Sequence, residues 1–387
     1  MARMTTTPDL IVVGSGIIGL ATAFLAHEQG RSVTVIDSAD RPVGSSIQNF
    51  GHACFTGQAD IIQDVAAVAR DGWRRAAAAA GFWAAESGTW IPATTDAEMQ
   101  VLREFADHRG AEQVTLVDAA GVAAGIGHPG LAAVGGAHLP WDMRVNPREA
   151  APVLADWLAR EGVAFVWNTQ VTGVADGVVE TVRGDFRATD VVVCPGYRLM
   201  GLFPELAERH ELRVCTLVMT LIDRPDRIPA ELGMLTGTSL ARYDGFAAMP
   251  GAGALREELA HREPELVDCI ANLMVTGIPG GLLVGDSHAY SLSPEPFIDE
   301  EIGQLLLNRA TGLLGIDRPV VRQRWLGQYA DSPATNLILD RPDSRTTVAV
   351  VASGIGMTLS FGVADLALTG GSVSGFRPAG DRRVTCT

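Results

Sequence analysis

The sequence carries little positive charge for its length. Lysine and arginine together number 30 against 45 aspartate and glutamate residues, so the 387 residues have a formal net charge of −15 at pH 7. Nucleic acids and anionic membrane surfaces attract proteins with an excess of positive charge. Because the balance here is acidic and no basic tract is present, we expect no nucleic acid and no membrane as partner.

Cysteine is scarce and long apolar runs are missing. The five cysteines form no CxxC pair and are Cys54, Cys194, Cys215, Cys269 and Cys386. This spacing predicts neither a disulfide framework nor a metal site and fits a reducing cytoplasm. Apolar runs such as Thr347 to Ala352 are far shorter than the ~20 residues of a membrane span, and the polar amino terminus has no signal-peptide pattern. The sequence therefore predicts a cytoplasmic, soluble protein.

Apolar residues, by contrast, make up 47% of the chain, enough for a large core and two interleaved domains. The first 37 residues predict a strand, a helix and a second strand. The first strand runs from Leu10 to Val13 and the second from Ser32 to Ile36. The helix between them extends from Ile17 to Gln29, with Gly30 as its stop signal.

A GxGxxG turn joins the first strand to this helix. Gly14 permits a tight turn, Gly16 lets a pyrophosphate approach the backbone, and Gly19 lets the helix pack on the strand. Asp37 closes the second strand, where its carboxylate can accept hydrogen bonds from an adenosine ribose. A lone GxGxxG is often a chance loop, but here the strand, the helix and the acid occur in register. The unit therefore predicts a dinucleotide site.

The next part of the chain, from about Thr56 to Leu116, is expected to be helical and carries no recognisable chemistry. Its helices are expected at Ala66 to Ala80 and at Asp96 to Ala106. A further helix is expected from Asn146 to Arg160, since Pro147 sits where a first-turn proline is tolerated.

A second set of strands follows this helix. Strands are expected at Ala164 to Trp167, Val171 to Val174 and Val178 to Val182. The run from Asp190 to Gly196 is typical of a buried parallel strand that meets a cofactor at a glycine turn.

The last third of the chain changes pattern and then returns to the first one. Alternating strands and one long helix, Asp299 to Leu314, are expected between Leu212 and Leu326. The strand Val348 to Ala352 then leads into the turn SGIGMT and a helix from Phe361 to Leu368. This turn is placed to present backbone N–H groups to the far end of a long cofactor.

Together these segments resemble the D-amino-acid oxidase superfamily of FAD-dependent oxidoreductases, which contains glycine oxidase and monomeric sarcosine oxidase. The resemblance covers nearly the whole chain. It rests on five segments in the same order: the GxGxxG turn with Asp37, the run from Gly44 to Gly51, the NPRE helix, the VVVCPG strand and the SGIGMT turn. The runs Asn49 to His52, Arg144 to Glu149 and Gly285 to Tyr290 are similar to a clade proposed to oxidise aminophosphonates related to 2-aminoethylphosphonate.

The resemblance implies an α/β fold in which a Rossmann-type FAD-binding domain is interleaved with a smaller α+β substrate domain that has an antiparallel or mixed sheet. The FAD-binding domain is expected at residues 1–60, 140–210 and 325–387, and the substrate domain at residues 61–139 and 211–324. The residues expected to hold FAD are Gly14, Gly16, Ile17, Ile18, Gly19, Asp37, Ser38, Ser45, Ser46, Asn49, Phe50, Gly51, Val171, Gly196, Gly327, Gly354, Ile355, Gly356, Met357 and Thr358.

Several departures from the sarcosine oxidase pattern remove chemical groups. Gly327 stands where that enzyme carries its flavin-linking cysteine, and Gln48 stands near the histidine that links flavin in other relatives, so FAD is expected to be non-covalent. The two cations that hold the substrate carboxylate correspond to Cys54 and Thr358, which implies that the substrate's acid group binds elsewhere or differs. Leu283 replaces the lysine that assists reaction with O2. As electron acceptor, O2 is therefore expected to be poor unless His52 or His288 supplies positive charge.

The implied reaction transfers hydride from the carbon that bears a neutral amine to flavin N5, so the protein supplies orientation and charge. His52 is a candidate for contact with flavin or for deprotonating the amine, and a purely structural histidine is an equal alternative. His288 and Tyr290 alternate on one strand and so face one side; they form either a substrate wall or an ordinary strand pair. Trp325 and Tyr329 are candidates for an aromatic cage, with core packing as the alternative.

For the substrate's acid group, the first candidate is Arg242, and Arg322 and Arg324 are less favoured candidates. Arginine is favoured because its guanidinium matches two phosphonate oxygens. The leading hypothesis is thus oxidative deamination of a small amine, in particular an aminophosphonate. A glycine- or sarcosine-type oxidase is the alternative within enzymology. The alternative of another class is a flavin-binding scaffold without catalysis.

Overall fold

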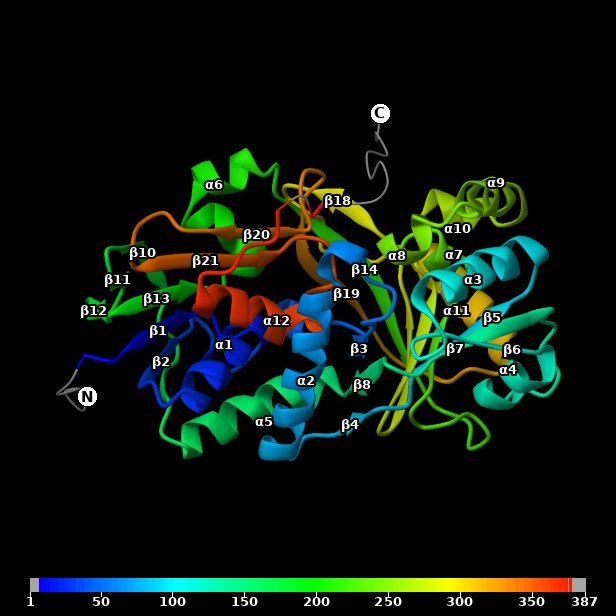
Figure 1. The fold of residues 1–387 in the computed structure, drawn as a ribbon, viewed down its shortest axis with the longest axis horizontal. Coiled ribbons are helices and arrows are strands. Elements are labelled where there is room, and N and C mark those ends of the chain that lie inside the picture. Colours follow the sequence, from blue (N-terminus) through cyan, green and yellow to red (C-terminus); the bar gives the residue numbers. More distant parts are fainter. Residues whose placement is uncertain (1–6, 375, 378–387) are drawn as a thin grey trace.

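The computed structural model describes residues 7–374 and 376–377. Cys386 lies outside the described residues. The chain forms two layered units side by side, one built on a six-stranded sheet and one on a nine-stranded sheet (Figure 1). This arrangement confirms the expected α/β class with a second, mixed sheet.

The six-stranded sheet has the order β20-β21-β13-β1-β2-β9 and is parallel except for its edge strand β20. Its strands are β1 (Leu10–Val13), β2 (Val33–Ile36), β9 (Ala164–Val166), β13 (Asp190–Val193), β20 (Leu337–Asp340) and β21 (Thr346–Val351). A parallel sheet is covered on both faces, which explains why β1, β2 and β21 are buried along their whole length.

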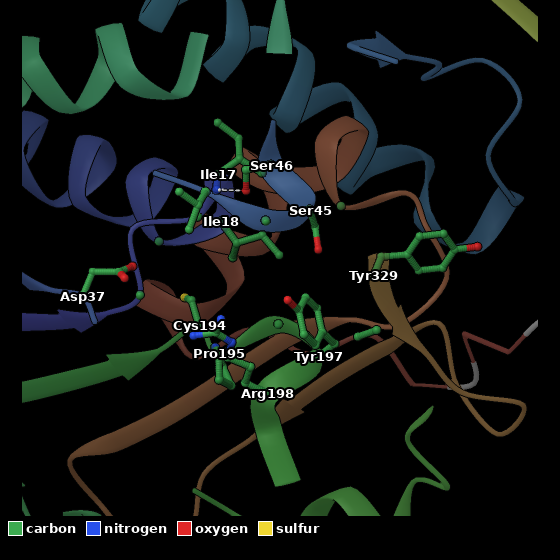
Figure 2. A pocket seen from close by; sticks show the side chains of 18 of the residues that line it. Ile17, Ile18, Asp37, Ser45, Ser46, Cys194, Pro195, Tyr197, Arg198 and Tyr329 are labelled. Carbon is green, nitrogen blue, oxygen red and sulfur yellow. Dashed lines mark hydrogen bonds between the residues drawn. The ribbon is translucent and has the colours of Figure 1, made fainter. Parts of the chain in front are cut away.

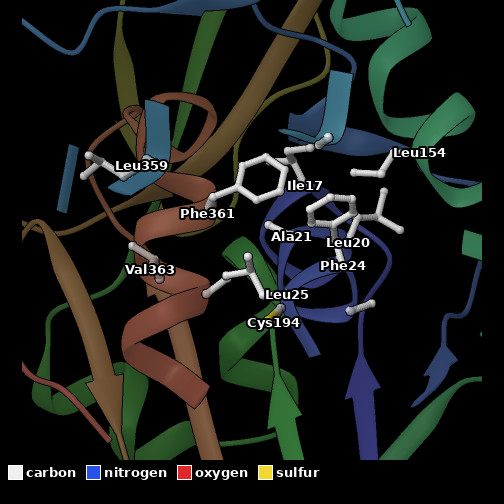
Figure 3. Close-up of a cluster of buried hydrophobic side chains, with 14 of the residues drawn as sticks. Ile17, Leu20, Ala21, Phe24, Leu25, Leu154, Cys194, Leu359, Phe361 and Val363 are labelled. Atoms are coloured by element: carbon white, nitrogen blue, oxygen red, sulfur yellow. The ribbon is translucent and has the colours of Figure 1, made fainter. Parts of the chain in front are cut away.

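Four helices pack on one face of this sheet: α1 (Ile17–Glu28), α2 (Gln63–Ala80), α5 (Pro147–Arg160) and α12 (Gly356–Thr369). Phe361 of α12 lies near Phe24 of α1 in this core (Figure 3). Its ring centroid is 5.8 Å from that of Phe24 and 5.2 Å from that of Trp73 of α2. Gly72 permits this approach, because a Cβ there would lie 2.4 Å from Phe361. Burying such aromatic side chains stabilises the packing of α12, whose amino-terminal turn faces the sheet's carboxyl edge.

The nine-stranded sheet has the order β18-β14-β17-β16-β15-β5-β7-β6, and β19 pairs with β14. It is antiparallel except for the β15–β5 pair. Its strands are β5 (Thr89–Ala93), β6 (Thr115–Val117), β7 (Gly135–Leu139), β14 (Arg213–Ile222), β15 (Gly233–Leu235), β16 (Met274–Ile278), β17 (Gly281–Gly285), β18 (Ala289–Ser291) and β19 (Val321–Asp331).

Further helices flank this sheet. Helix α11 (Glu300–Leu314) packs on β14 and β17, with Asp299 as its N-cap. The others are α3 (Asp96–Arg109), α4 (Ala119–Ile126), α7 (Gly237–Leu240), α8 (Asp244–Ala247), α9 (Ala252–Arg262) and α10 (Pro264–Asp268). Helix α6 (Pro204–Arg209) instead packs on β1, β13 and β21 of the six-stranded sheet. Two three-stranded sheets complete the fold. The first has the order β3-β8-β4, with β3 (His52–Ala53), β4 (Ala84–Ala85) and β8 (Met143–Val145). The second has the order β10-β11-β12, with β10 (Val171–Ala175), β11 (Val178–Thr181) and β12 (Phe186–Arg187).

Three expectations about elements were wrong. The stretch from Thr56 to Leu116 is not all helical, because β5 enters the nine-stranded sheet between β15 and β7. The region from Leu212 to Leu326 contains not one helix but five, α7 to α11. Helix α12 begins at Gly356 rather than at Phe361, so the SGIGMT turn is already its first turn.

Helix α2 lies within the range expected for the substrate domain, yet its buried face packs on α12 and α5 in the core of the six-stranded unit. Among the described residues, no helix combines the length and the apolar character that crossing a membrane requires.

Candidate functional site

A cavity of about 580 Å³ opens at the carboxyl ends of β1, β2 and β13. In Figure 2, Asp37 lies at one end of this first cavity and Tyr329 at the other, with Ile17, Ser46 and Tyr197 between them. Carboxyl ends of parallel strands are where open α/β sheets bind dinucleotides. Fifteen of the residues expected to hold FAD line it: Gly14, Gly16, Ile17, Ile18, Gly19, Asp37, Ser38, Ser45, Ser46, Asn49, Val171, Gly196, Gly354, Gly356 and Met357.

The three glycines of the GxGxxG turn have distinct roles in the structure. Gly14 has a φ of +101°, and a Cβ there would lie 2.5 Å from the carbonyl oxygen of Cys194. A Cβ on Gly19 would lie only 1.9 Å from the carbonyl oxygen of Gly14, so the helix could not pack on the turn. Gly16 differs, because its Cβ position meets only the Ser46 Oγ, at 3.1 Å. That position faces the cavity, and an added side chain there would fill it.

The amino terminus of α1 and the Asp37 carboxylate define the two polar ends of an adenosine diphosphate moiety. The Ile17 backbone N–H donates to Ser46 Oγ at 2.8 Å. Asp37 accepts hydrogen bonds from Ser15 N at 2.6 Å and from Ala39 N at 2.9 Å, which fixes its carboxylate at the cavity wall. The amino terminus of a helix attracts pyrophosphate, and a fixed acid binds ribose hydroxyls. The residues present therefore fit FAD.

Five of the residues expected to hold FAD do not line the first cavity. Phe50 and Ile355 line a neighbouring cavity instead. Gly51, Gly327 and Thr358 line neither cavity. A Cβ on Gly327 would lie 2.7 Å from a Leu217 methyl group and 2.9 Å from the Gln48 carbonyl oxygen, so this position accepts no side chain without a shift. Thr358 instead donates its hydroxyl to the carbonyl oxygen of His52.

The second cavity is smaller, about 90 Å³, and it adjoins the first. Four residues line both cavities: Asn49, Tyr329, Gly354 and Met357. Because it meets the end of the first cavity that is opposite Asp37, a dinucleotide bound by Asp37 would direct its other end here. The polar residues that line the second cavity are Asn49, His52, Gln58, Arg242, Tyr243, Asp244, Asn272, Asp286, His288, Tyr329 and Ser353.

Arg242 brings a guanidinium to the second cavity. It follows α7 and donates to the Tyr290 hydroxyl at 3.2 Å. The Tyr290 ring is covered on one face by the guanidinium of Arg213, 4.1 Å from the ring centroid, and this holds the tyrosine in place. Tyr290 thus positions Arg242 and does not itself line the cavity.

His52 lies in a buried network whose hydrogen count assigns its tautomer. The Thr89 hydroxyl has one proton and donates it to Asp142 at 2.6 Å. Thr89 Oγ therefore accepts from Arg144, at 2.8 Å, and from His52 Nε2, at 2.9 Å. Nε2 carries the proton in the neutral ring, so Nδ1 carries a lone pair. Burial, with Arg144 nearby, lowers the pKa of His52 to about 4, so the ring stays neutral near pH 7.

Asp286 and His288 follow β17 and line the same cavity. Burial raises the pKa of Asp286 to about 7, although nearby Arg242 acts in the opposite direction. His288 donates from Nδ1 to the Ile270 carbonyl oxygen at 2.9 Å, and its Nε2 lies 3.9 Å from Asp286 Oδ2. These two residues place a carboxyl group and an imidazole ring at the wall of the second cavity.

The remaining candidates lie away from the cavity. Trp325 donates its indole N–H to the Gln48 carbonyl oxygen and stacks under Arg148, so it does not form a cage with Tyr329. Arg322 donates to the Gly280 carbonyl oxygen, and Arg324 pairs with Glu300. Neither arginine lines either cavity. Cys54 is fully buried, and burial raises the pKa of its thiol well above the usual value.

Sequence reasoning missed Thr89, Asp142, Arg144 and Asp286. Ligand atoms of His52, Cys54 and Asp142 lie within 4.8 Å of one another. However, Asp142 already accepts from Thr56 N and Thr89, and Arg144 is also in this network, so the group is a hydrogen-bonded support for His52. Arg144 and Asp286 had a sequence signal, because they lie within the runs Arg144 to Glu149 and Gly285 to Tyr290, whereas Thr89 and Asp142 had none.

Comparison with solved structures finds the same fold in several oxidases and a dehydrogenase. Glycine oxidase from Geobacillus kaustophilus is 18% identical, with a TM-score of 0.76 over 97% of this chain and 99% of that one. L-proline dehydrogenase from P. horikoshii is 17% identical, with a TM-score of 0.76 over 96% and 97%. Iminodiacetate oxidase from a Chelativorans species is 17% identical, with a TM-score of 0.72 over 96% and 99%.

No curated protein matches this chain in a sequence search. One protein family, described as FAD dependent oxidoreductase, matches residues 9–368. That range includes the GxGxxG turn, both cavities and the first turns of α12. The chain therefore belongs to the FAD-dependent oxidoreductases.

Proposed function

We propose that this enzyme oxidises the C–N bond of a small zwitterionic amine at FAD, by oxidative deamination. The observation that carries the proposal is the second cavity, which adjoins the dinucleotide cavity and contains both the Arg242 guanidinium and the Asp286 carboxyl group. When bound, FAD accepts the hydride from the carbon that bears the amine. The protein's own groups bind and orient the substrate and exclude water.

Arg242 is the group that would bind the substrate's acid. The chain contains no lysine, so the side chains that can bring positive charge to an acid group are arginine and protonated histidine. Among the arginines in the described part of the chain, Arg198 lines the first of these two cavities and only Arg242 lines the second. A guanidinium donates two parallel hydrogen bonds to a carboxylate or phosphonate. Held by Tyr290, it would fix the amine end of the substrate at the flavin side of the cavity.

Within this class we propose an aminophosphonate related to 2-aminoethylphosphonate as the substrate. Support comes from the sequence runs around His52, Arg144 and Asp286 and from the change at Cys54 and Thr358. Both residues are buried and line neither cavity, so neither contributes a charge to acid binding. A small carboxylate such as sarcosine would therefore lack the two cations used in sarcosine oxidase.

An anaerobic substrate screen tests the proposal. The purified holoenzyme would be mixed with 2-aminoethylphosphonate, its N-methyl derivative, glycine and sarcosine, and flavin absorbance would be followed. We expect bleaching by an aminophosphonate. Bleaching by glycine or sarcosine alone would replace the aminophosphonate with an amino acid, and failure of every amine would favour a scaffold with structural flavin. Readmission of air then tests O2 as the acceptor.

A separate prediction concerns the attachment of the cofactor. Gly327 offers no nucleophile and Gln48 none comparable to histidine, so acid precipitation should release all flavin into the supernatant. The measurement is the flavin absorbance of supernatant and pellet after denaturation. Yellow colour that stays in the washed pellet would contradict non-covalent binding.

A further inference from the structure

Three buried acceptor atoms in the second cavity have no hydrogen-bond partner within the described residues. They are Oδ1 of Asp286, Nδ1 of His52 and Oδ1 of Asn272. The side chains of Asp286 and His52 are more than nine-tenths buried, with 7% and 2% exposed. A buried polar atom without a hydrogen-bond partner destabilises the protein. Three such atoms around one cavity therefore indicate a ligand that brings hydrogen-bond donors.

The segment that carries Asp286 is fixed by its backbone. Asn272 N donates to the Asp286 carbonyl oxygen at 2.9 Å, and Asp286 N donates to the Asn272 carbonyl oxygen at 3.3 Å. His288, two residues further along, is also anchored, because its backbone N–H donates to the Cys269 carbonyl oxygen at 3.1 Å. The Asp286 carboxyl group is thus held at the cavity wall before any ligand arrives.

The cavity also contains opposite charges. Arg242 lines it together with Asp286, and its charge lowers the pKa of that carboxyl group against the effect of burial. A molecule with an acid at one end and an ammonium group at the other complements this arrangement. Its acid would bind the guanidinium, and its N–H groups would satisfy the three acceptor atoms.

We propose that Asp286, His52 and Asn272 form the amine subsite of this enzyme, and that Asp286 accepts the proton that makes the amine reactive. The proposal rests on the proposed function. In this step one N–H bond of the substrate ammonium breaks, its electron pair stays on nitrogen, and an O–H bond forms at Asp286 Oδ1. The neutral amine keeps N–H groups that donate to His52 Nδ1 and Asn272 Oδ1. The substrate class is therefore a zwitterion with a primary ammonium group, whose three N–H groups match the three acceptor atoms.

The direction of the pH dependence follows from the state of Asp286. Its pKa of about 7 means that the carboxylate, which accepts the proton, increases as pH rises through 7. His52 stays neutral in this range because burial lowers its pKa to about 4. The titratable and charged groups around Asp286 are Cys215, Arg242, Tyr243, Cys269 and His288. We expect the flavin-reduction rate at low substrate concentration to rise through about pH 7.

Asp286→Asn tests this role, because the amide keeps the volume and removes the negative charge. We expect the variant to retain FAD, to lose the rise near pH 7 and to reduce flavin at least tenfold more slowly. The matched control is Glu98→Gln, which alters a buried carboxylate that pairs with Arg262 outside both cavities. The control should keep the wild-type pH profile. An Asp286→Asn profile that still rises near pH 7 would overturn the proposal.

Binding of matched ligand pairs separates this inference from the proposed function. The pairs are 2-aminoethylphosphonate with ethylphosphonate and glycine with acetate, and binding is read anaerobically from changes in flavin absorbance. Wild type should bind the ammonium member of at least one pair tenfold or more tightly, and Asp286→Asn should nearly abolish that preference. Asn272→Leu, which removes one acceptor and no charge, should reduce it severalfold and provides the test if Asp286→Asn does not fold.

Preserved preference in these variants, or none in wild type, would overturn the amine subsite. A wild-type preference without flavin bleaching would instead refute the proposed oxidation and leave the subsite standing.

Discussion

Gly16→Val should give a folded protein that purifies without its yellow colour. Gly16 is the N-cap of α1 and has ordinary extended backbone angles, φ −64° and ψ 171°, so valine is compatible with the backbone there. The only nearby atom is the Ser46 Oγ, which lies at the end of a side chain that can rotate away. The branched side chain would then occupy the space in which a pyrophosphate must reach the helix N–H groups.

The expected loss is large because the hydrogen bonds from the backbone to pyrophosphate are charge-assisted. Two such bonds at roughly 1.5–3 kcal/mol each correspond to a loss of about 10² to 10⁴ in FAD affinity. The measurement is flavin absorbance per protein, together with circular dichroism as a check of folding. Gly19→Ala is the contrasting variant, because its Cβ would overlap the Gly14 carbonyl oxygen and should prevent native packing. A yellow Gly16→Val protein with full flavin content would refute the pyrophosphate assignment.

The dinucleotide cavity could be predicted because its determinants are local. Strand β1, the glycine turn, α1 and β2 occupy one continuous segment from Leu10 to Ile36, and Gly19 packs against Gly14 within that segment. The boundaries differed by one residue at Gln29 and at Ser32, as is usual at element ends. Local periodicity and turn chemistry therefore suffice for this half of the site.

The substrate cavity could not be predicted in the same way, because sheet register assembles it. Tyr290 and Tyr329 are far apart in sequence, yet both pair with Cys215 of β14, one on each side. The sequence instead suggested Trp325 and Tyr329 as an aromatic cage, and both lie on β19. Four residues along a strand span about 13 Å, by the rise of about 3.3 Å per residue. Trp325 therefore packs over Gln48, away from the cavity.

The buried network behind His52 was equally inaccessible from sequence. Thr89 lies in β5, a strand that was expected to be part of a helical region, and Asp142 lies just before β8. The pairing of β3 with β8, in which His52 is opposite Arg144, and that of β5 with β7, in which Thr89 is opposite Leu139, bring these segments together. A polar side chain in such a position looks like an ordinary strand or loop residue until the pairing is known.

Arg242→Met should abolish high-affinity substrate binding while leaving FAD in place. Methionine keeps much of the length of the side chain but removes the two hydrogen bonds that a guanidinium donates to a carboxylate or phosphonate. At roughly 1.5–3 kcal/mol each, their loss weakens binding of the acid by about 10² to 10⁴. Arg242 lines the second cavity and not the first, so flavin content should stay unchanged. The measurement is single-turnover flavin reduction as a function of substrate concentration.

A second readout distinguishes charge removal from general damage. Arg242 lowers the pKa of Asp286, so its removal should raise that pKa above 7 and move the rise of the reduction rate to higher pH. Tyr290→Phe is the matched control: it removes only the hydroxyl that holds Arg242, leaves the positive charge, and should weaken binding about tenfold without moving the pH profile. Wild-type affinity and pH profile in Arg242→Met would exclude Arg242 as the anion-binding residue. They would direct attention to Tyr329 and His288, which line the same cavity.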